Sequence, residues 1–248
     1  MRIVLFPFAL VALALAPLPL ALTACGAASP APLAAPVEAP PGTTARTARL
    51  AGGLPIYLER RPGDVAAVQL WIAAGALDEA QAERGAAFAL ERLTEATLRA
   101  RLASLGARVD AWSTVDATAF EIVVPADLLG PALAVLAEVV QVAPEAPDDA
   151  TRAAWDALQT AARGDPARRA LEAALARLNP GHPAGRAPLP DSSALVALDA
   201  TALRAFHAHR YTPDAARLVI VGPVDPAAVE RLAAPLAAWT GTARARPA

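Results

Sequence analysis

The sequence predicts an α+β domain in which a mixed, largely antiparallel sheet carries helices packed on one face. Short apolar runs of strand length alternate with longer segments whose apolar residues recur at helical spacing. Neighbouring strands are joined by short turns, which favours antiparallel pairing, and long helices separate the pairs. Aromatic residues make up only 4% of the chain, so the core must be built from leucine, valine and alanine.

Turn residues and apolar periodicity predict the first half of the domain. Gly52 and Gly53 lie between two extended runs and indicate a hairpin. Gly106 is typical of a helix end, and Pro125 is typical of a strand end. The expected elements are strands 46–50, 54–60, 65–73, 108–113 and 117–124, and helices 84–93 or beyond, 97–105 and 128–142.

The second half is predicted to be mostly helical. The turn residues in 164–166 and 179–183 interrupt the helical periodicity, and Asp199 is a typical N-cap. The expected elements are helices 150–163, 167–178, 200–209 and 226–239, with a buried strand at 218–221. The domain is therefore expected over 45–240, with 241–248 as a tail.

Segment 1–24 is typical of a lipoprotein signal peptide and not of a folded domain. A positive start is followed by an almost wholly apolar run that ends in Leu22-Thr23-Ala24-Cys25. This ending matches a lipobox, in which small residues precede a cysteine that receives a diacylglyceryl group. Cys25 is the only cysteine, so a disulfide within one chain is excluded. We expect export, lipidation of Cys25 and anchoring in the bacterial cell envelope, on the periplasmic side or at the outer membrane.

Two other interpretations of segment 1–24 stay open. The run is long enough to span a bilayer without cleavage, and it would also serve as a plain secretion signal. Pro7, Pro17 and Pro19 interrupt the run, and the lipobox follows it, which favours the lipoprotein. Residues 25–44 are rich in alanine and proline and are expected to form an extended linker from the lipidated cysteine.

Charge and motifs exclude several classes of function. The formal net charge is −2, which leaves no basic excess for nucleic acid. The sequence contains no G-x-S-x-G motif and no P-loop, and its acidic residues form no convincing pair for glycosidase chemistry. The three histidines are His182 in a turn, and His207 and His209 on one helix. The last two are two residues apart, so they point to different faces and do not indicate a metal site.

Several segments, in order, resemble the insulinase/pitrilysin family of zinc metallopeptidases. GLPIYLERRPGDVAAVQLWIAAGALDE is similar to the opening hairpin and strand of the family, and RGAAFALERL falls where the family carries G-x-x-H-x-x-E-H. LGARVDAWSTVDATAFEIVVPADLLGPALAVLAEVV, GDPARRALEAALARLNPGHPAGR and LRAFHAHRYTPDAARLVIVGPVD resemble later elements. The resemblance covers about 45–240. It implies one domain of the N-terminal type, similar to mitochondrial processing peptidase, from a family whose members carry two in tandem or as two subunits.

The resemblance also implies that the zinc ligands have been replaced. In the family, two histidines four residues apart on one helix bind zinc, and the glutamate between them activates water. The first histidine position falls on Phe88, the base position on Glu91 and the second histidine position on Arg92. Phenylalanine cannot ligate zinc, and arginine is a permanent cation that repels it. We therefore expect no zinc, no other cofactor and no confident catalytic residue.

The third family ligand is a glutamate on a later helix. Its position falls on Ala157, or on Leu158 if the gap is placed differently, and the adjacent Asp156 is the only carboxylate nearby. Glu91, without zinc, is expected to be a solvated or arginine-paired helix residue. The family usually has a longer loop after the motif helix, whereas 93–97 joins two predicted helices almost directly. This shortening indicates a remodelled cleft.

An edge strand is the feature expected to survive the loss of zinc. In the family such a strand takes up substrate through backbone hydrogen bonds, which do not need the lost side chains. The matching residues, a possible peptide-binding edge strand, are Asp110, Ala111, Trp112, Ser113 and Thr114. Trp112 is either a peptide contact or, more commonly for a tryptophan, a packing residue.

Together these features predict a metallopeptidase-like lipoprotein that is a pseudoenzyme. It would serve as a non-catalytic subunit or peptide-binding domain beside a partner peptidase chain. Its expected partners are the membrane through the lipid anchor, a second insulinase-type subunit and a peptide ligand. The alternatives are a structural envelope lipoprotein without peptide binding and an active zinc peptidase with atypical ligands. An apolar face left exposed on the isolated domain would favour the subunit over the structural lipoprotein.

Overall fold

The computed structural model describes residues 44–50, 52–186, 190 and 192–245. The signal peptide, Cys25 with its lipobox and nearly all of the linker expected over 25–44 lie outside the described residues. Within the described part of the chain, no helix is both long enough and apolar enough to cross a membrane.

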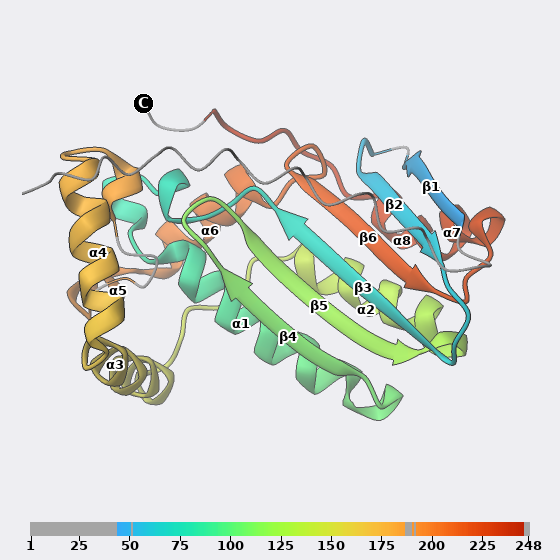
Figure 1. Cartoon of the computed structure of the whole chain (residues 1–248), viewed down its shortest axis with the longest axis horizontal. Helices are drawn as coiled ribbons and strands as arrows, with labels where there is room; N and C mark the ends of the chain where they lie inside the picture. Colours follow the sequence, from blue (N-terminus) through green and yellow to red (C-terminus); the bar gives the residue numbers. More distant parts are fainter. Residues whose placement is uncertain (1–43, 51, 187–189, 191, 246–248) are drawn as a thin grey trace, which may run out of the picture. The chain divides into compact units, whose positions relative to one another are not determined.

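The strands of the described residues form one six-stranded mixed sheet in the order β1-β2-β6-β3-β5-β4 (Figure 1). Neighbouring strands are antiparallel except β2 and β6, which are parallel. The last strand in the chain therefore lies between the second and the third, and β1 and β4 are the two edges. The strands are β1 (Thr44–Arg49), β2 (Pro55–Arg60), β3 (Val65–Ile72), β4 (Arg108–Ser113), β5 (Thr118–Pro125) and β6 (Ala216–Gly222).

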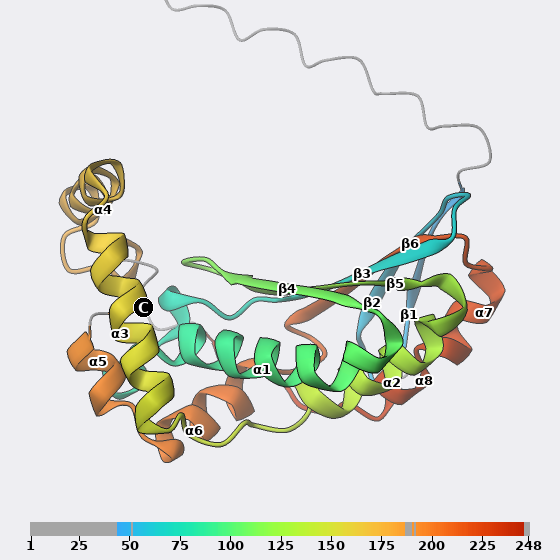
Figure 2. The ribbon, with the colours of Figure 1, turned by 90° about the horizontal axis from the view of Figure 1, so that it is seen from below.

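Helices cover one face of this sheet, and Figure 2 shows the layer edge-on. Helix α1 lies under β4 and β5, and α2, α7 and α8 lie under the rest of the sheet, while α3, α4 and α5 lie beyond its end. The helices are α1 (Ala86–Leu102), α2 (Leu129–Val140), α3 (Asp149–Arg163), α4 (Pro166–Leu178), α5 (Ser192–Ala197), α6 (Ala200–Arg210), α7 (Pro226–Leu232) and α8 (Ala234–Ala237). Short 3-10 turns are η1 (Ala76–Asp78), η2 (Gln81–Glu83), η3 (Ala103–Leu105), η4 (Ala126–Leu128) and η5 (Pro183–Gly185). The predicted α+β fold class is confirmed.

The core lies between the sheet and these helices. Alternate residues of a strand point to opposite faces, and on β3 the residues that face the helices are fully buried. They meet apolar residues of α1 and α2, as expected for one core per domain. The members of this core include Ala66, Val68, Leu70 and Ile72 of β3, Leu90, Leu98 and Leu102 of α1, and Leu133 and Leu136 of α2.

The opposite face of the sheet carries both apolar and charged residues, and the described helices leave it uncovered (Figure 2). Strand β6 is apolar on both faces except at Arg217, which is exposed on this side. The register of the strands brings the side chains of this surface together. We call it the outer face. Its apolar residues are Tyr57, Val65, Ala67, Trp71, Trp112, Val123, Val219 and Val221, and the same register places Glu59, Gln69, Arg108, Asp110, Glu121 and Arg217 on it.

The two helices predicted over 84–93 and 97–105 are a single helix, α1, followed by η3. Segment 93–97 contains neither glycine nor proline, so nothing in it ends a helix. The Thr97 hydroxyl donates a hydrogen bond of 2.9 Å to the Leu93 carbonyl one turn earlier, which satisfies it inside the helix. Gly106 does end the helical segment, with φ of 65°.

Two further differences concern helix ends. The helix predicted over 226–239 is divided into α7 and α8 at Ala233, because Pro235 lacks the N–H that a continuous helix needs. The short α5 was not predicted, since six residues are too few to show a helical period. Residues 241–245, expected to be a tail, are tied to the domain. The Ala243 N–H donates to Asp214, and Arg210 donates to the Arg244 carbonyl.

Candidate functional site

A buried carboxylate defines the start of α1. Gly85 is the N-cap, with φ of 88°, and it has no side chain to accept the free N–H groups of the first turn. Glu79 does this instead, accepting a hydrogen bond of 3.0 Å from the Ala87 N–H. Burial raises the pKa of Glu79 to about 7. Hydrogen bonds from the Gly85 and Ala87 N–H groups and the charge of Arg186 act in the opposite direction, lowering the pKa. Glu79 therefore holds the start of α1, the helix that carries the three motif positions, in place.

The first family ligand position is part of the apolar core. Phe88 is only 1% exposed, and its ring meets Trp155 of α3 edge-to-face, with centroids 5.5 Å apart. The guanidinium carbon of Arg92 lies 5.7 Å from the centroid of the same ring, in cation–π contact. Two aromatic rings and a cation thus occupy the space in front of this position.

The second ligand position is the start of a charged row along α1. The Arg92 Nε lies 3.4 Å from a carboxylate oxygen of Glu91, and its Nη1 donates to Glu95 at 3.3 Å. Glu95 also accepts from Arg99, one turn further along the helix. The row Arg92–Glu95–Arg99 follows the spacings at which helix side chains meet. We refer to it below as the arginine row.

The base position is a buried carboxyl group. Glu91 is 1% exposed, and burial raises its pKa to about 7, while Arg92 opposes that rise and Glu95 adds to it. Its Oε1 has no hydrogen-bond partner among the described residues. Tyr211 is also buried, and both burial and the Glu91 charge raise the pKa of its hydroxyl. Of the two states expected for Glu91, solvated or paired with arginine, the structure shows the second, because Glu91 is buried beside Arg92.

Helix α3 presents different residues from those that the resemblance assigns to the third ligand. Ala157 and Leu158 are exposed, and Asp156 is also exposed and accepts a hydrogen bond from Ser192. The buried residues of α3 are Trp155 and Gln159, one helical turn apart. The sequence placement differs from the geometry because an apolar helix pattern does not mark which position of a turn faces α1.

Two of the three histidines have structural partners. His182 Nδ1 accepts a hydrogen bond of 3.1 Å from the Ala184 N–H, which caps η5. The ring of His207 stacks on Tyr211 at 4.7 Å, and its Nε2 lies 3.0 Å from the Val140 carbonyl oxygen. Across the described residues, no three histidine, cysteine, aspartate or glutamate side chains are grouped so that they could hold a metal ion.

These residues do not fit the zinc ion that the sequence resemblance implies. A zinc site needs three protein donors around an open position. The only carboxylate at the motif, Glu91, has a guanidinium nitrogen 3.4 Å away, where a second cation would be repelled. The first ligand position offers a ring that packs against another ring. The side chains present are those of a closed ion pair and a packed core.

The predicted peptide-binding residues lie at an edge of the sheet that no other described strand covers. Asp110 to Ser113 belong to β4, which is the terminal strand next to β5, and Thr114 begins the following turn. The ring of Trp112 meets Trp71 of β3 edge-to-face, with centroids 5.6 Å apart. Trp112 thus packs against the outer face and stays half-buried, so it contributes to both packing and surface.

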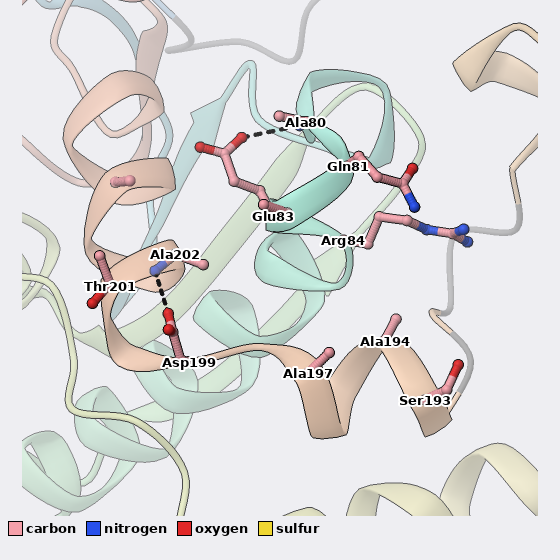
Figure 3. Close-up of a pocket in the computed structure, with 12 residues that line it drawn as sticks. Ala80, Gln81, Glu83, Arg84, Ser193, Ala194, Ala197, Asp199, Thr201 and Ala202 are labelled. Atoms are coloured by element: carbon pink, nitrogen blue, oxygen red, sulfur yellow. Dashed lines mark hydrogen bonds between the residues drawn. The ribbon is translucent and has the colours of Figure 1, made fainter.

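A cavity of about 780 Å³ lies beside η2, α5 and the start of α6 (Figure 3). Half of its lining residues are alanines. Figure 3 shows Asp199 accepting from the Ala202 N–H and Glu83 accepting from the Ala80 N–H. Sequence reasoning missed this cavity because it is built by small residues from segments that are far apart in the chain. It does not include Phe88, Glu91 or Arg92.

Comparison with known proteins gives a consistent result. The family described as Insulinase (Peptidase family M16) matches residues 56–161. An uncharacterized zinc protease of Mycobacterium leprae is 30% identical over 187 residues, which are 71% of this chain and 42% of that protein. This chain thus spans less than half the length of that relative.

Solved structures agree on the fold. An inactive domain of peptidase M16 from Pseudomonas fluorescens superposes with a TM-score of 0.73 at 22% identity, over 82% of this chain and 53% of that one. The first half of the periplasmic protease PqqL from Escherichia coli gives 0.71 at 21% identity, over 82% and 48%. At this level of identity the likeness establishes the fold of the domain.

Proposed function

We propose that this chain, whose domain is of the insulinase type (peptidase family M16), is a zinc-deficient pseudoenzyme that binds peptides beside a partner peptidase chain. One observation carries the proposal. At the helix where the family holds zinc, Phe88 packs on Trp155 and Arg92 forms an ion pair with Glu91. A fixed cation and a filled core leave Glu91 no metal-bound water to activate.

The outer face, which the described helices leave uncovered, supports the proposal of a partner chain. Apolar side chains that are exposed together on one surface often mark a site of protein–protein contact. Tyr57 is 45% exposed and Val65 is 55% exposed, and both belong to strands whose other face is fully packed. The M16 structures that resemble this domain come from chains about twice the length that it covers. A second insulinase-type chain would supply the missing layer.

The free edge of β4 supports peptide binding. Edge strands present unpaired N–H and C=O groups to an added strand, and this mode of recognition needs no catalytic side chain. The domain is proposed to be held at the envelope by the lipid on Cys25. This places peptide binding on the exported side of the membrane.

Affinity capture with the full chain from envelope extracts of its own host tests the partner. The expected result is recovery of an insulinase-family chain, identified by mass spectrometry. The double variant Tyr57→Glu with Val65→Glu is expected to reduce that recovery by about tenfold or more, because two charges in an apolar interface are costly to desolvate.

The matched control is Leu178→Glu with Val196→Glu, which changes residues of similar or greater exposure on α4 and α5, away from the outer face. Recovery should stay at the wild-type level in this control. Equal recovery by both double variants, or no insulinase-family chain in any capture, would remove the partner from the proposal.

A further inference from the structure

The arginine row lies beside the free edge of β4, and together they define a ligand class. We propose that this edge binds an extended peptide in which acidic residues alternate with apolar ones. The acidic side chains would lie over Arg92 and Arg99, and the apolar ones beside Trp112. This inference rests on the proposed peptide binding and specifies its chemistry.

The backbone groups that face outward on β4 follow from two hydrogen bonds. The Thr114 N–H donates to the Ala117 carbonyl at 2.7 Å across the hairpin, so the backbone N–H of Thr114 points toward the neighbouring strand. The N–H and C=O groups of successive residues in an antiparallel strand point alternately toward and away from the neighbouring strand. Those of Val109, Ala111 and Ser113 therefore point away from β5. Consistently, the Val109 carbonyl accepts a hydrogen bond of 3.0 Å from the Arg99 side chain, outside the sheet.

This arrangement leaves a short, defined docking segment. Arg99 already occupies the Val109 carbonyl, so an added strand begins its pairing at Ala111. Among the described residues, no side chain or turn donates to or accepts from the backbone of Ala111 or Ser113 outside the sheet. The N–H and C=O groups of these two residues are the ones that a peptide would pair with.

Arg92 lies beside this segment when positions are compared along the length of α1 and β4. Helix α1 and strand β4 run side by side in opposite directions in both ribbon views (Figures 1 and 2). From Arg99, which contacts Val109, Arg92 lies about 10 Å back along the helix at roughly 1.5 Å per residue. The same length corresponds to about three residues of strand. Along the strand direction, Arg92 therefore lies close to the position of Trp112.

On the helix side of β4, the exposed charges that a peptide would meet are those of two arginines, whereas Asp110 lies on the outer face and pairs with Arg108. Arg92 and Arg99 share Glu95, whose side chain is 12% exposed, against 37% and 60% for the two arginines. Arg92 also lies 3.4 Å from the buried Glu91, but each guanidinium carries five N–H donors, more than these carboxylates accept in the fold. A carboxylate on an added strand would form charge-assisted hydrogen bonds with these donors.

The pleat of the strand sets the alternation. Residues directly opposite on paired strands point to the same face. A peptide residue opposite Trp112 would point to the outer face, beside the Trp71–Trp112 pair, and would be apolar. Residues opposite Ala111 and Ser113 would point to the helix side, where Ala111 packs against the core next to α1. These are the positions that favour an acid.

Three blocked, fluorescently labelled octapeptides test the inference, alternating valine with glutamate, with glutamine or with lysine. Fluorescence anisotropy with the full chain would measure their affinities at low and at high salt. The glutamate peptide is expected to bind about tenfold more tightly than the glutamine peptide at low salt, with the lysine peptide weakest. High salt should reduce this preference.

Two variants complete the test. Arg92→Gln with Arg99→Gln should abolish the preference for glutamate. The control Arg101→Gln should keep it, because Arg101 pairs with Glu138 away from the edge. If the glutamine and glutamate peptides bind equally, or the preference survives in the double variant, the acidic specificity is overturned while peptide binding stands. If no peptide binds, both are overturned.

Discussion

Replacing Phe88 by alanine is expected to lower the free energy of unfolding by about 3–5 kcal/mol, the cost typical of truncating a buried aromatic residue. Phe88 is 1% exposed and packs edge-to-face on Trp155, so its removal leaves a cavity between α1 and α3. The cation–π contact with Arg92 would be lost as well. Urea unfolding followed by circular dichroism measures the change.

The control is Leu178→Ala on α4, a side chain that is 77% exposed. Its effect should stay within about 0.5 kcal/mol, as for other surface substitutions. A loss of less than about 1 kcal/mol for Phe88→Ala would mean that the first ligand position has room around it, contrary to the packed core described above.

The second large effect is expected for Glu91→Gln, which should stabilise the domain by about 3 kcal/mol at pH 8 and hardly at all at pH 4. The pKa of Glu91 is raised from its ordinary value of 4.5 to about 7 in the folded state. Below pH 4.5 the carboxyl is protonated in both the folded and the unfolded chain, so its contribution to stability is fully present. As the pH rises through 7, the buried group must ionise and that contribution is lost.

Glutamine keeps the shape of the protonated acid and does not ionise. The difference in unfolding free energy between Glu91→Gln and the natural chain should therefore grow between pH 4.5 and 7 and then level off. Glu79, which shares the raised pKa of about 7, is unchanged in both proteins and cancels from the difference. Chemical unfolding at a series of pH values supplies the two curves.

Glu138→Gln serves as the control, because Glu138 is exposed on α2 and pairs only with an exposed arginine. Its curve should run parallel to that of the natural chain. If Glu91→Gln proves less stable than the natural chain at pH 8, the ion pair with Arg92 outweighs the cost of burying the charge. Glu91 would then be a fixed anion and not a group that titrates near neutral pH.

Much of the fold was predictable from local pattern. Period-two and helical spacing of apolar residues are short-range properties, and they identified the strands and most helices. The order of strands in the sheet was not predictable in this way, because β6 pairs with β2 and β3 through contacts between distant segments. The division of the last helix at Ala233 could have been found from Pro235, whose missing N–H is visible in the sequence.

The site was predictable on α1 and less so elsewhere. The resemblance to the zinc motif identified Phe88, Glu91 and Arg92 as neighbours on one helix, and the structure places them together. Trp155, Gln159 and Tyr211 were missed as parts of this site. Their contribution depends on how α3 and the end of α6 pack on α1, and neither a tryptophan nor a tyrosine in a sequence indicates which residue of another helix it will contact.

The most direct test of the account is the zinc content of the purified full chain, measured by plasma mass spectrometry after equilibration with zinc and removal of unbound metal. The account predicts far less than one zinc per chain, since Phe88 and Arg92 offer no donor and Glu91 is paired with a cation. One tightly held zinc per chain, together with peptide cleavage, would contradict it and would make Glu91 and Asp156 the first residues to replace.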